Sequence, residues 1–151
     1  MPRERTTQLV AELERAGITT NVSDDIKLDL WRKFAFIVSL NVVCGLSRGP
    51  VGPVLASERG RTLLTDSLRE IVVVSRAAGT PLSDADREQI KTDLFALAPK
   101  MEPSFLWDLQ RGGPTELETL AGAVSRIGRE HGIPTPVHDV ATAAFDIATQ
   151  H

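Results

Sequence analysis

A lysine and an asparagine are spaced so that one face of a helix would present both to a small polar ligand. Lys33, Ile37 and Asn41 recur at intervals of four residues, so on a helix they form a row about 12 Å long. A desolvated lysine can deliver a proton as a general acid, and an asparagine amide can fix a polar substrate. The same spacing suits a lysine that extends to solvent and an asparagine that is hydrogen-bonded inside the core. Spacing alone does not choose between these interpretations.

A second group of polar residues lies in the last third of the chain. Ser104 and Asp108 are four residues apart, and Glu116 follows a turn formed by residues 111–114. Glu116 is expected at the first position of a helix, where the helix dipole stabilises a carboxylate by about 0.3–1 kcal/mol. Purely structural roles also explain these residues, with Ser104 as a helix-start residue and Asp108 on a solvated face.

The length and charge of the chain restrict the classes of protein to which it can belong. The chain has 151 residues, of which 42% are hydrophobic and 25% charged, and this composition is typical of a single folded domain. Seventeen basic residues against twenty acidic residues give a net charge of -3. That balance lacks the basic stripe that binds phosphate backbones, so no nucleic-acid partner is expected.

The amino terminus carries charges of both signs and no apolar run, so no secretory signal is expected. The longest apolar stretch, Phe34–Leu46, includes polar residues and is shorter than the ~20 residues that cross a bilayer. We therefore expect a buried helix, no membrane partner and a cytoplasmic location. The single Cys44 fits a reducing compartment and is expected to be a buried free thiol.

The residues that usually hold a metal or a nucleotide are missing from the sequence. His131, His138 and His151 lack the i, i+4 spacing of a helical metal pair, so no metal site is expected. Gly49–Pro53 has two glycines at the wrong spacing for a phosphate-binding turn, and its prolines remove N–H donors. No Gly-x-Ser-x-Gly nucleophile turn is present either.

Apolar residues recur mostly every three or four positions, which predicts an all-α fold. Ser83 with Asp86 resembles a capping box and marks one helix start. Ile18–Val22 is the best strand candidate, but one strand cannot form a sheet. The expected helices span residues 6–16, 26–46, 61–78, 83–97, 104–109, 115–131 and the residues after Pro136.

Several short motifs follow one another in a fixed order. They are Leu30-Trp31-Arg32-Lys33, Asn41, Ser104 with Asp108, Gly113-Pro114-Thr115-Glu116-Leu117-Glu118 and Gly132-Ile133-Pro134-Thr135-Pro136. This ordered set resembles the carboxy-terminal domain of ketopantoate reductase, also called 2-dehydropantoate 2-reductase, and the resemblance covers about Arg5 to Phe145. The fold it implies is an all-α helical bundle of the 6-phosphogluconate dehydrogenase C-terminal-domain-like type.

The resemblance also implies a reaction, the NADPH-dependent reduction of the 2-keto group of ketopantoate to pantoate on the route to pantothenate and coenzyme A. Lys33 matches the catalytic acid of the family. Asn41 and Ser104 match substrate-binding residues, and Glu116 matches a residue that contacts the cofactor, NADP. An ammonium suits this reaction, because hydride addition to a ketone builds an alkoxide that a nearby proton donor stabilises.

The family's amino-terminal Rossmann domain, with its glycine-rich turn, is not found in this sequence. We expect residues 1–22 to be a remnant of the linker and of the last helix and strand of that domain, and residues 23–151 to be the helical domain. The chain is thus expected to be a fragment or a separately expressed domain. Because NADP would be bound mainly by the Rossmann domain, we expect the chain alone to be inactive.

Two residues depart from the family pattern, which leaves the substrate open. Ile37 stands where the family has an asparagine, and Val42 stands where a proline is usual. One alternative is therefore a family reductase for another 2-keto acid. Another is a non-catalytic helical interaction or dimerisation module. The expected partners are a small 2-keto acid and a second copy of the chain in a homodimer.

Overall fold

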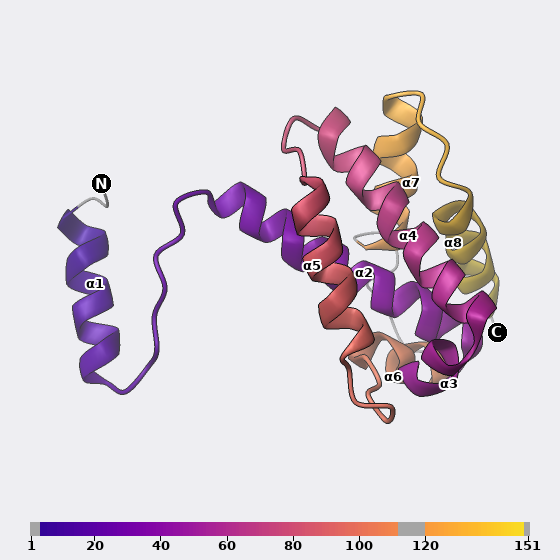
Figure 1. The fold of residues 1–151 in the computed structure, drawn as a ribbon, viewed down its shortest axis with the longest axis horizontal. Helices are drawn as coiled ribbons and strands as arrows, with labels where there is room; N and C mark the ends of the chain where they lie inside the picture. The colour runs from indigo at the N-terminus through magenta and orange to yellow at the C-terminus, as the bar shows by residue number, and fades with distance from the viewer. Residues whose placement is uncertain (1–3, 112–119, 150–151) are drawn as a thin grey trace.

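Helices form all the regular structure in the computed structural model, which describes residues 4–111 and 120–149 (Figure 1). The helices of this described part are α1 (Glu4–Arg15), α2 (Ile26–Ser47), α3 (Val51–Ala56), α4 (Glu58–Ala77), α5 (Asp84–Phe95), α6 (Ser104–Arg111), α7 (Ala121–Glu130) and α8 (Pro136–Thr149). The predicted all-α bundle is confirmed. The strand candidate at 18–22 is extended coil here, with no strand beside it among the described residues to pair with.

Helix α2 is the central element of the bundle, as its apolar composition predicted. The side chain of Asp25 accepts a hydrogen bond from the Leu28 N–H at 3.0 Å, which caps the start of the helix. The helix ends where Arg48 adopts a left-handed conformation with φ 55°. With 22 residues and a mean hydropathy of 1.3, the helix is long and apolar enough to cross a membrane. Half of that span, however, is buried within the protein. We interpret α2 as a core helix.

The segment that looked like a glycine-proline turn continues into a short helix, α3. Pro50 precedes the helix and Pro53 lies in its first turn, where a missing N–H leaves no intrahelical bond unmade. The Gly52 N–H donates to the Pro99 carbonyl at 3.0 Å, and a Cβ at Gly52 would lie 2.6 Å from the same oxygen. Glycine is thus required by a close approach to the chain before α6, a contact that short-range sequence signals do not reveal.

Helix α5 starts at the capping box that the sequence predicted. The Ser83 hydroxyl accepts from the Asp86 N–H at 3.1 Å, and the Asp86 carboxylate accepts from the Ser83 N–H at 2.8 Å. The other carboxylate oxygen of Asp86 accepts from Nε of Arg32 at 2.7 Å. The start of α5 is therefore tied to the amino-terminal half of α2.

Helix α8 holds α6 against α2 through aromatic packing. The rings of Phe145 and Phe105 meet edge to face with centroids 5.1 Å apart. Gly45 of α2 admits this pair, because a Cβ there would lie 2.5 Å from Phe145 and 3.1 Å from Phe105. The position of α6 thus depends on how α8 is seated.

The start of α8 is fastened to α4 by a buried carboxylate. Glu70 accepts from the N–H of Val137 at 2.9 Å, from the N–H of His138 at 3.2 Å and from Nδ1 of His138 at 2.6 Å. Nε2 of His138 lies 3.4 Å from the hydroxyl of Ser67. Because a carboxylate only accepts hydrogen bonds, Nδ1 of His138 carries its proton here.

Helix α1 stands apart from the bundle and is joined to it by the extended segment (Figure 1). None of its residues is buried, and the side chain of Leu9 is 59% exposed. Apolar side chains in the connecting segment, Ile18 and Val22, are exposed as well. The apolar face of this region has no partner within the described residues.

Candidate functional site

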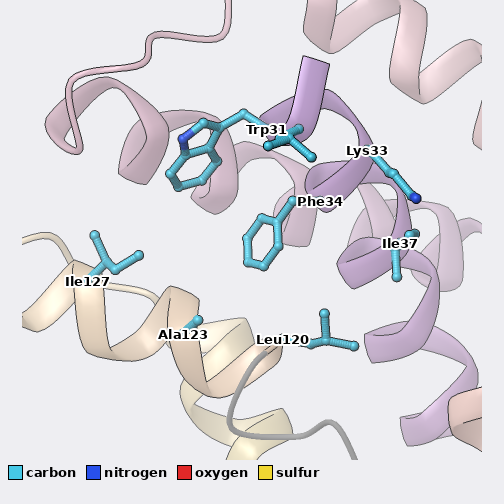
Figure 2. A pocket seen from close by; sticks show the side chains of 8 residues that line it. Trp31, Lys33, Phe34, Ile37, Leu120, Ala123 and Ile127 are labelled. Carbon is cyan, nitrogen blue, oxygen red and sulfur yellow. The ribbon is translucent and has the colours of Figure 1, made fainter. Parts of the chain in front are cut away.

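The row of residues on α2 borders a cavity of about 430 Å³ that lies between the amino-terminal half of α2 and α7 (Figure 2). Lys33 and Ile37 both line it, so helix geometry places these two predicted positions at one site. The remaining lining residues are Leu30, Trp31, Phe34, Leu120, Ala123 and Ile127. In Figure 2 the ring of Phe34 points into the space between the two helices, while the amino group of Lys33 lies at its edge.

Lys33 is exposed and has no ion-pair partner among the described residues. Its neighbour Arg32, by contrast, is bonded to Asp29 at 2.8 Å and to Asp86 at 2.7 Å. The lysine ammonium is therefore left for a ligand. The desolvation of Lys33 that was considered from the sequence is not found in this chain, because the first turns of α2 extend beyond the buried part of the bundle.

Asn41 lies one turn beyond Ile37, where α2 enters the core. Its side chain is only 5% exposed, and no described residue forms a hydrogen bond with it. The Asn41 amide is therefore available to a ligand at the point where α2 enters the core. The core hydrogen bond that would have explained Asn41 structurally is thus not found in the described part of the chain. Asn41 is not one of the residues that line the cavity beside Lys33.

Ser104 is the first residue of α6 and is exposed, as is Asp108 one turn later. The next residue, Phe105, packs on α2 at Gly45, which is one turn beyond Asn41. The fold therefore brings Ser104 to the Asn41 end of the row and not to the Lys33 end. Glu116 lies outside the described residues.

The charges around the start of α2 hold the turn that carries Lys33. Burial alone would raise the pKa of Asp86, but hydrogen bonds from Ser83 and Arg32 outweigh it and leave this pKa below its ordinary value. The hydrogen bond to Asp86, followed by that to Asp29, raises the pKa of Arg32. This network ties α2 to α5 beside the cavity.

Cys44 does not contribute a nucleophile to the site. The thiol is buried, as predicted, and burial together with the negative charge of Glu102 raises its pKa to about 12. No group of three potential metal ligands occurs among residues 4–111 and 120–149.

The part of the site that sequence reasoning missed is the apolar wall supplied by α7. Leu120, Ala123 and Ile127 follow helical spacing, which predicts only that they share a face. Their position opposite α2, nearly ninety residues away in sequence, follows from the packing of α7 on α4 and α8. The sequence did indicate the aromatic part of the wall, because two large rings, Trp31 and Phe34, precede the buried part of α2.

Comparison with known families identifies relatives over most of the chain. The profile of the ketopantoate reductase PanE/ApbA C-terminal family matches residues 25–148. A curated 2-dehydropantoate 2-reductase from Mesorhizobium japonicum is 30% identical over 140 residues, which cover 93% of this chain and 42% of that protein. The chain thus spans less than half the length of the curated relatives it matches.

Solved structures agree with this similarity. A PanE/ApbA family ketopantoate reductase from Ralstonia eutropha JMP134 has a TM-score of 0.88 and 27% identity, covering 99% of this chain and 51% of that chain. The ternary structure of D-mandelate dehydrogenase with NADH and anilino(oxo)acetate has a TM-score of 0.85 and 20% identity, covering 97% of this chain and 61% of that chain. At this identity, the second likeness is one of fold.

Proposed function

The chain belongs to the ketopantoate reductase family through its C-terminal domain, and on that premise we propose that it is the substrate-binding and catalytic half of an NADPH-dependent 2-dehydropantoate 2-reductase. The reaction would convert ketopantoate to pantoate for the synthesis of pantothenate and coenzyme A. The observation that carries the proposal is the unpaired ammonium of Lys33 at the edge of a cavity, on the same face of α2 as the unpartnered amide of Asn41.

Lys33 is the proton donor in this proposal. When a hydride adds to C2 of a 2-oxo acid, the electron pair of the C=O double bond moves to the oxygen. A protonated Nζ beside that oxygen stabilises the developing alkoxide and then gives it a proton, which leaves a neutral amine and a 2-hydroxy acid. Among the described residues, Lys33 has no ion pair that would have to break before it donates this proton.

Asn41 and Ser104 are proposed to bind the polar atoms of the substrate. The Asn41 amide offers both a donor and an acceptor, and the Ser104 hydroxyl is exposed on α6 near the same end of the row. A ligand that bonds to Asn41 would meet an amide that has no hydrogen-bond partner among the described residues. Asp108 is left as a residue that supports α6.

The described residues do not by themselves fit a dinucleotide. The described lining of the cavity offers a single cation and seven apolar side chains, whereas a pyrophosphate is normally cradled by glycine N–H groups at a helix start. We therefore propose that NADP is held mainly by a Rossmann domain outside residues 23–151, with residues 1–22 as its remnant and Glu116 as a cofactor contact. When bound, NADPH would supply the hydride.

The test is the reductase activity of this chain joined to a family Rossmann domain. Lys33→Ala should lower kcat by about two to four orders of magnitude, and Lys33→Arg should restore little, because arginine stays charged. Lys27→Ala is the matched control, because Lys27 is also exposed on α2 but does not line the cavity. A Lys33→Ala protein that folds and keeps a near-native kcat would refute the assignment.

The unjoined chain provides a second test. It should show no reductase activity and no tight binding of NADPH by calorimetry, because no glycine-rich turn holds the pyrophosphate. Micromolar affinity of the chain alone for NADPH would contradict the proposal that the Rossmann domain holds the cofactor. Inactivity of the joined protein toward every 2-oxo acid would favour the alternative of a non-catalytic interaction module.

A family reductase for another 2-oxo acid is the second candidate function, and Ile37 favours it. This apolar side chain stands in the row between Lys33 and Asn41, where it offers no hydrogen bond to a substrate. The structurally similar D-mandelate dehydrogenase was solved with NADH, so both NADH and NADPH should be assayed.

The exposed apolar face of α1 supports a homodimer as a further part of the proposal. In the unjoined chain, where no Rossmann domain covers residues 1–22, Leu9 and the exposed Ile18 would be covered by a second copy of the chain. Light scattering at several concentrations should then give twice the mass of the chain, and hydrogen exchange should show protected amides in α1. A strict monomer would refute the dimer. We also propose a cytoplasmic location, which the single buried thiol supports and which fractionation of cells would test.

A further inference from the structure

We infer that the cavity between α2 and α7 receives the side chain of the 2-oxo acid and selects an apolar side chain, branched aliphatic or phenyl, over the hydroxylated side chain of ketopantoate. The inference rests on the second candidate function, a family reductase for another 2-oxo acid, because it takes Lys33 to hold the oxygen of the 2-oxo group at the edge of the cavity.

The lining of the cavity is mostly apolar, and its charged group is at one edge. Seven of its eight described lining residues are aliphatic or aromatic, and the one charged group among them, the ammonium of Lys33, lies at the edge, while Trp31 adds a neutral indole N–H. A 2-oxo acid has the matching division, with its oxygen atoms at one end and its side chain at the other. If the oxygen atoms meet Lys33, the side chain extends along the apolar lining.

The size of the cavity allows more than a methyl group. A dry apolar cavity of about 150 Å³ already accepts benzene, whereas the space here measures about 430 Å³. Trp31 and Phe34 meet edge to face with ring centroids 5.4 Å apart, so these two aromatic side chains brace each other on α2. A phenyl ring or a branched chain therefore fits between this aromatic wall and α7.

Ile37 makes the cavity selective against a hydroxyl group. It lies one turn from Lys33, and Leu120, which lies between Ile37 and Ala123 in Figure 2, offers no hydrogen bond either. A hydroxyl placed there would give up its bonds to water without a replacement. We expect this to weaken the binding of ketopantoate about tenfold relative to an apolar acid of similar size.

Trp31 provides a direct readout of the cavity without cofactor or turnover. The chain has two tryptophans, and the indole of Trp107 is held on the surface by a hydrogen bond to Glu102 at 2.8 Å. In a ¹H–¹⁵N correlation spectrum of the 151-residue chain, Trp107→Phe assigns the two indole signals. Titration with 4-methyl-2-oxopentanoate should move the Trp31 signal at about one tenth of the concentration that ketopantoate requires, while the Trp107 signal stays in place.

Two substitutions test the lining from opposite helices. Ile37→Asn should bring the affinities for the two acids to within about threefold of each other. Ala123→Leu fills part of the cavity and should weaken the branched acid about tenfold while affecting pyruvate little. Ala143→Leu, the same change on the exposed face of α8, is the control and should leave both affinities unchanged. Circular dichroism confirms that each variant is folded.

The outcomes separate the inference from the proposed function. If ketopantoate binds as tightly as the branched acid, or if neither substitution changes the ratio, the side-chain pocket is wrong while the 2-oxo acid site stands. If neither acid moves the Trp31 signal, both ideas fail. If the branched acid binds but Lys33→Ala leaves its affinity unchanged, the cavity binds apolar molecules without recognising the 2-oxo group, and the inference is overturned.

Discussion

Replacing Glu70 should loosen α8 and thereby the whole carboxyl-terminal side of the site. Its carboxylate accepts three hydrogen bonds from the first turn of α8, at 2.9, 3.2 and 2.6 Å, and both Glu70 and His138 are almost completely buried. Two of the three donors are the backbone N–H groups of Val137 and His138. They belong to the four N–H groups that a helix start leaves without intrahelical partners. Glu70 therefore acts as a helix cap supplied by a different helix.

The expected magnitude follows from those contacts. Glu70→Ala leaves two N–H groups and the imidazole N–H of His138 without partners, and breaking such a buried network costs about 3–5 kcal/mol. Glu70→Gln keeps one acceptor oxygen but turns an NH₂ group toward a donor, so the loss should be smaller, about 1–3 kcal/mol. At about 2–4 °C per kcal/mol for a domain of this size, Glu70→Ala should lower Tm by roughly 10 °C.

Thermal unfolding followed by circular dichroism measures whether Glu70→Ala lowers Tm more than Glu70→Gln does. Glu88→Ala on the exposed face of α5 is the control that leaves Tm unchanged. Hydrogen exchange adds a local readout, since the amides of Val137 and His138 should lose protection before those of α2. If Glu70→Ala unfolds at the same temperature as the control, or if those amides keep their protection, the carboxylate does not anchor α8.

Three further predictions concern other parts of the bundle. Cys44 should resist iodoacetamide at pH 8 until the chain is unfolded in urea, because its thiol is buried with a pKa of about 12; rapid labelling of the folded chain would contradict this. Asp86 has a folded-state pKa below its unfolded value, so its stabilisation is present above about pH 4 and is lost as the pH falls through the folded-state value. The difference in Tm between wild type and Asp86→Asn should accordingly shrink below about pH 4, and a constant difference would show that charge is not involved. Gly45→Ala should destabilise the chain by about 1–3 kcal/mol in urea unfolding, because its Cβ would lie 2.5 Å from Phe145, whereas Gly49→Ala has open space and serves as the control.

Much of the fold was predictable from local chemistry. The Ser83 side chain can bond to the N–H group three residues ahead, so the start of α5 was found from the sequence. Gly17, Gly79 and Gly132 all adopt positive φ after helices, as expected for glycine at those positions. The helix expected at 61–78 is found as α4, although it contains the run Ile71–Val74, which is rich in β-branched residues.

Sequence reasoning was weaker where a distant segment decides the local structure. Ile18–Val22 has the composition of a strand, but a strand needs a neighbour, and no described residue pairs with it. Helix α3 was missed because the contact of Gly52 with Pro99 joins residues almost fifty positions apart.

The sequence by itself determined which residues could do chemistry and the order in which they occur. A four-residue interval places Lys33, Ile37 and Asn41 on one helix face whatever the rest of the chain does, because helix geometry is local. Only the tertiary structure decided what surrounds them. Lys33 is exposed and free of ion pairs, Asn41 is buried without a partner among the described residues, and the wall opposite comes from α7. Burial and cavity shape depend on packing between segments far apart in sequence, and periodicity within one segment carries no information about them.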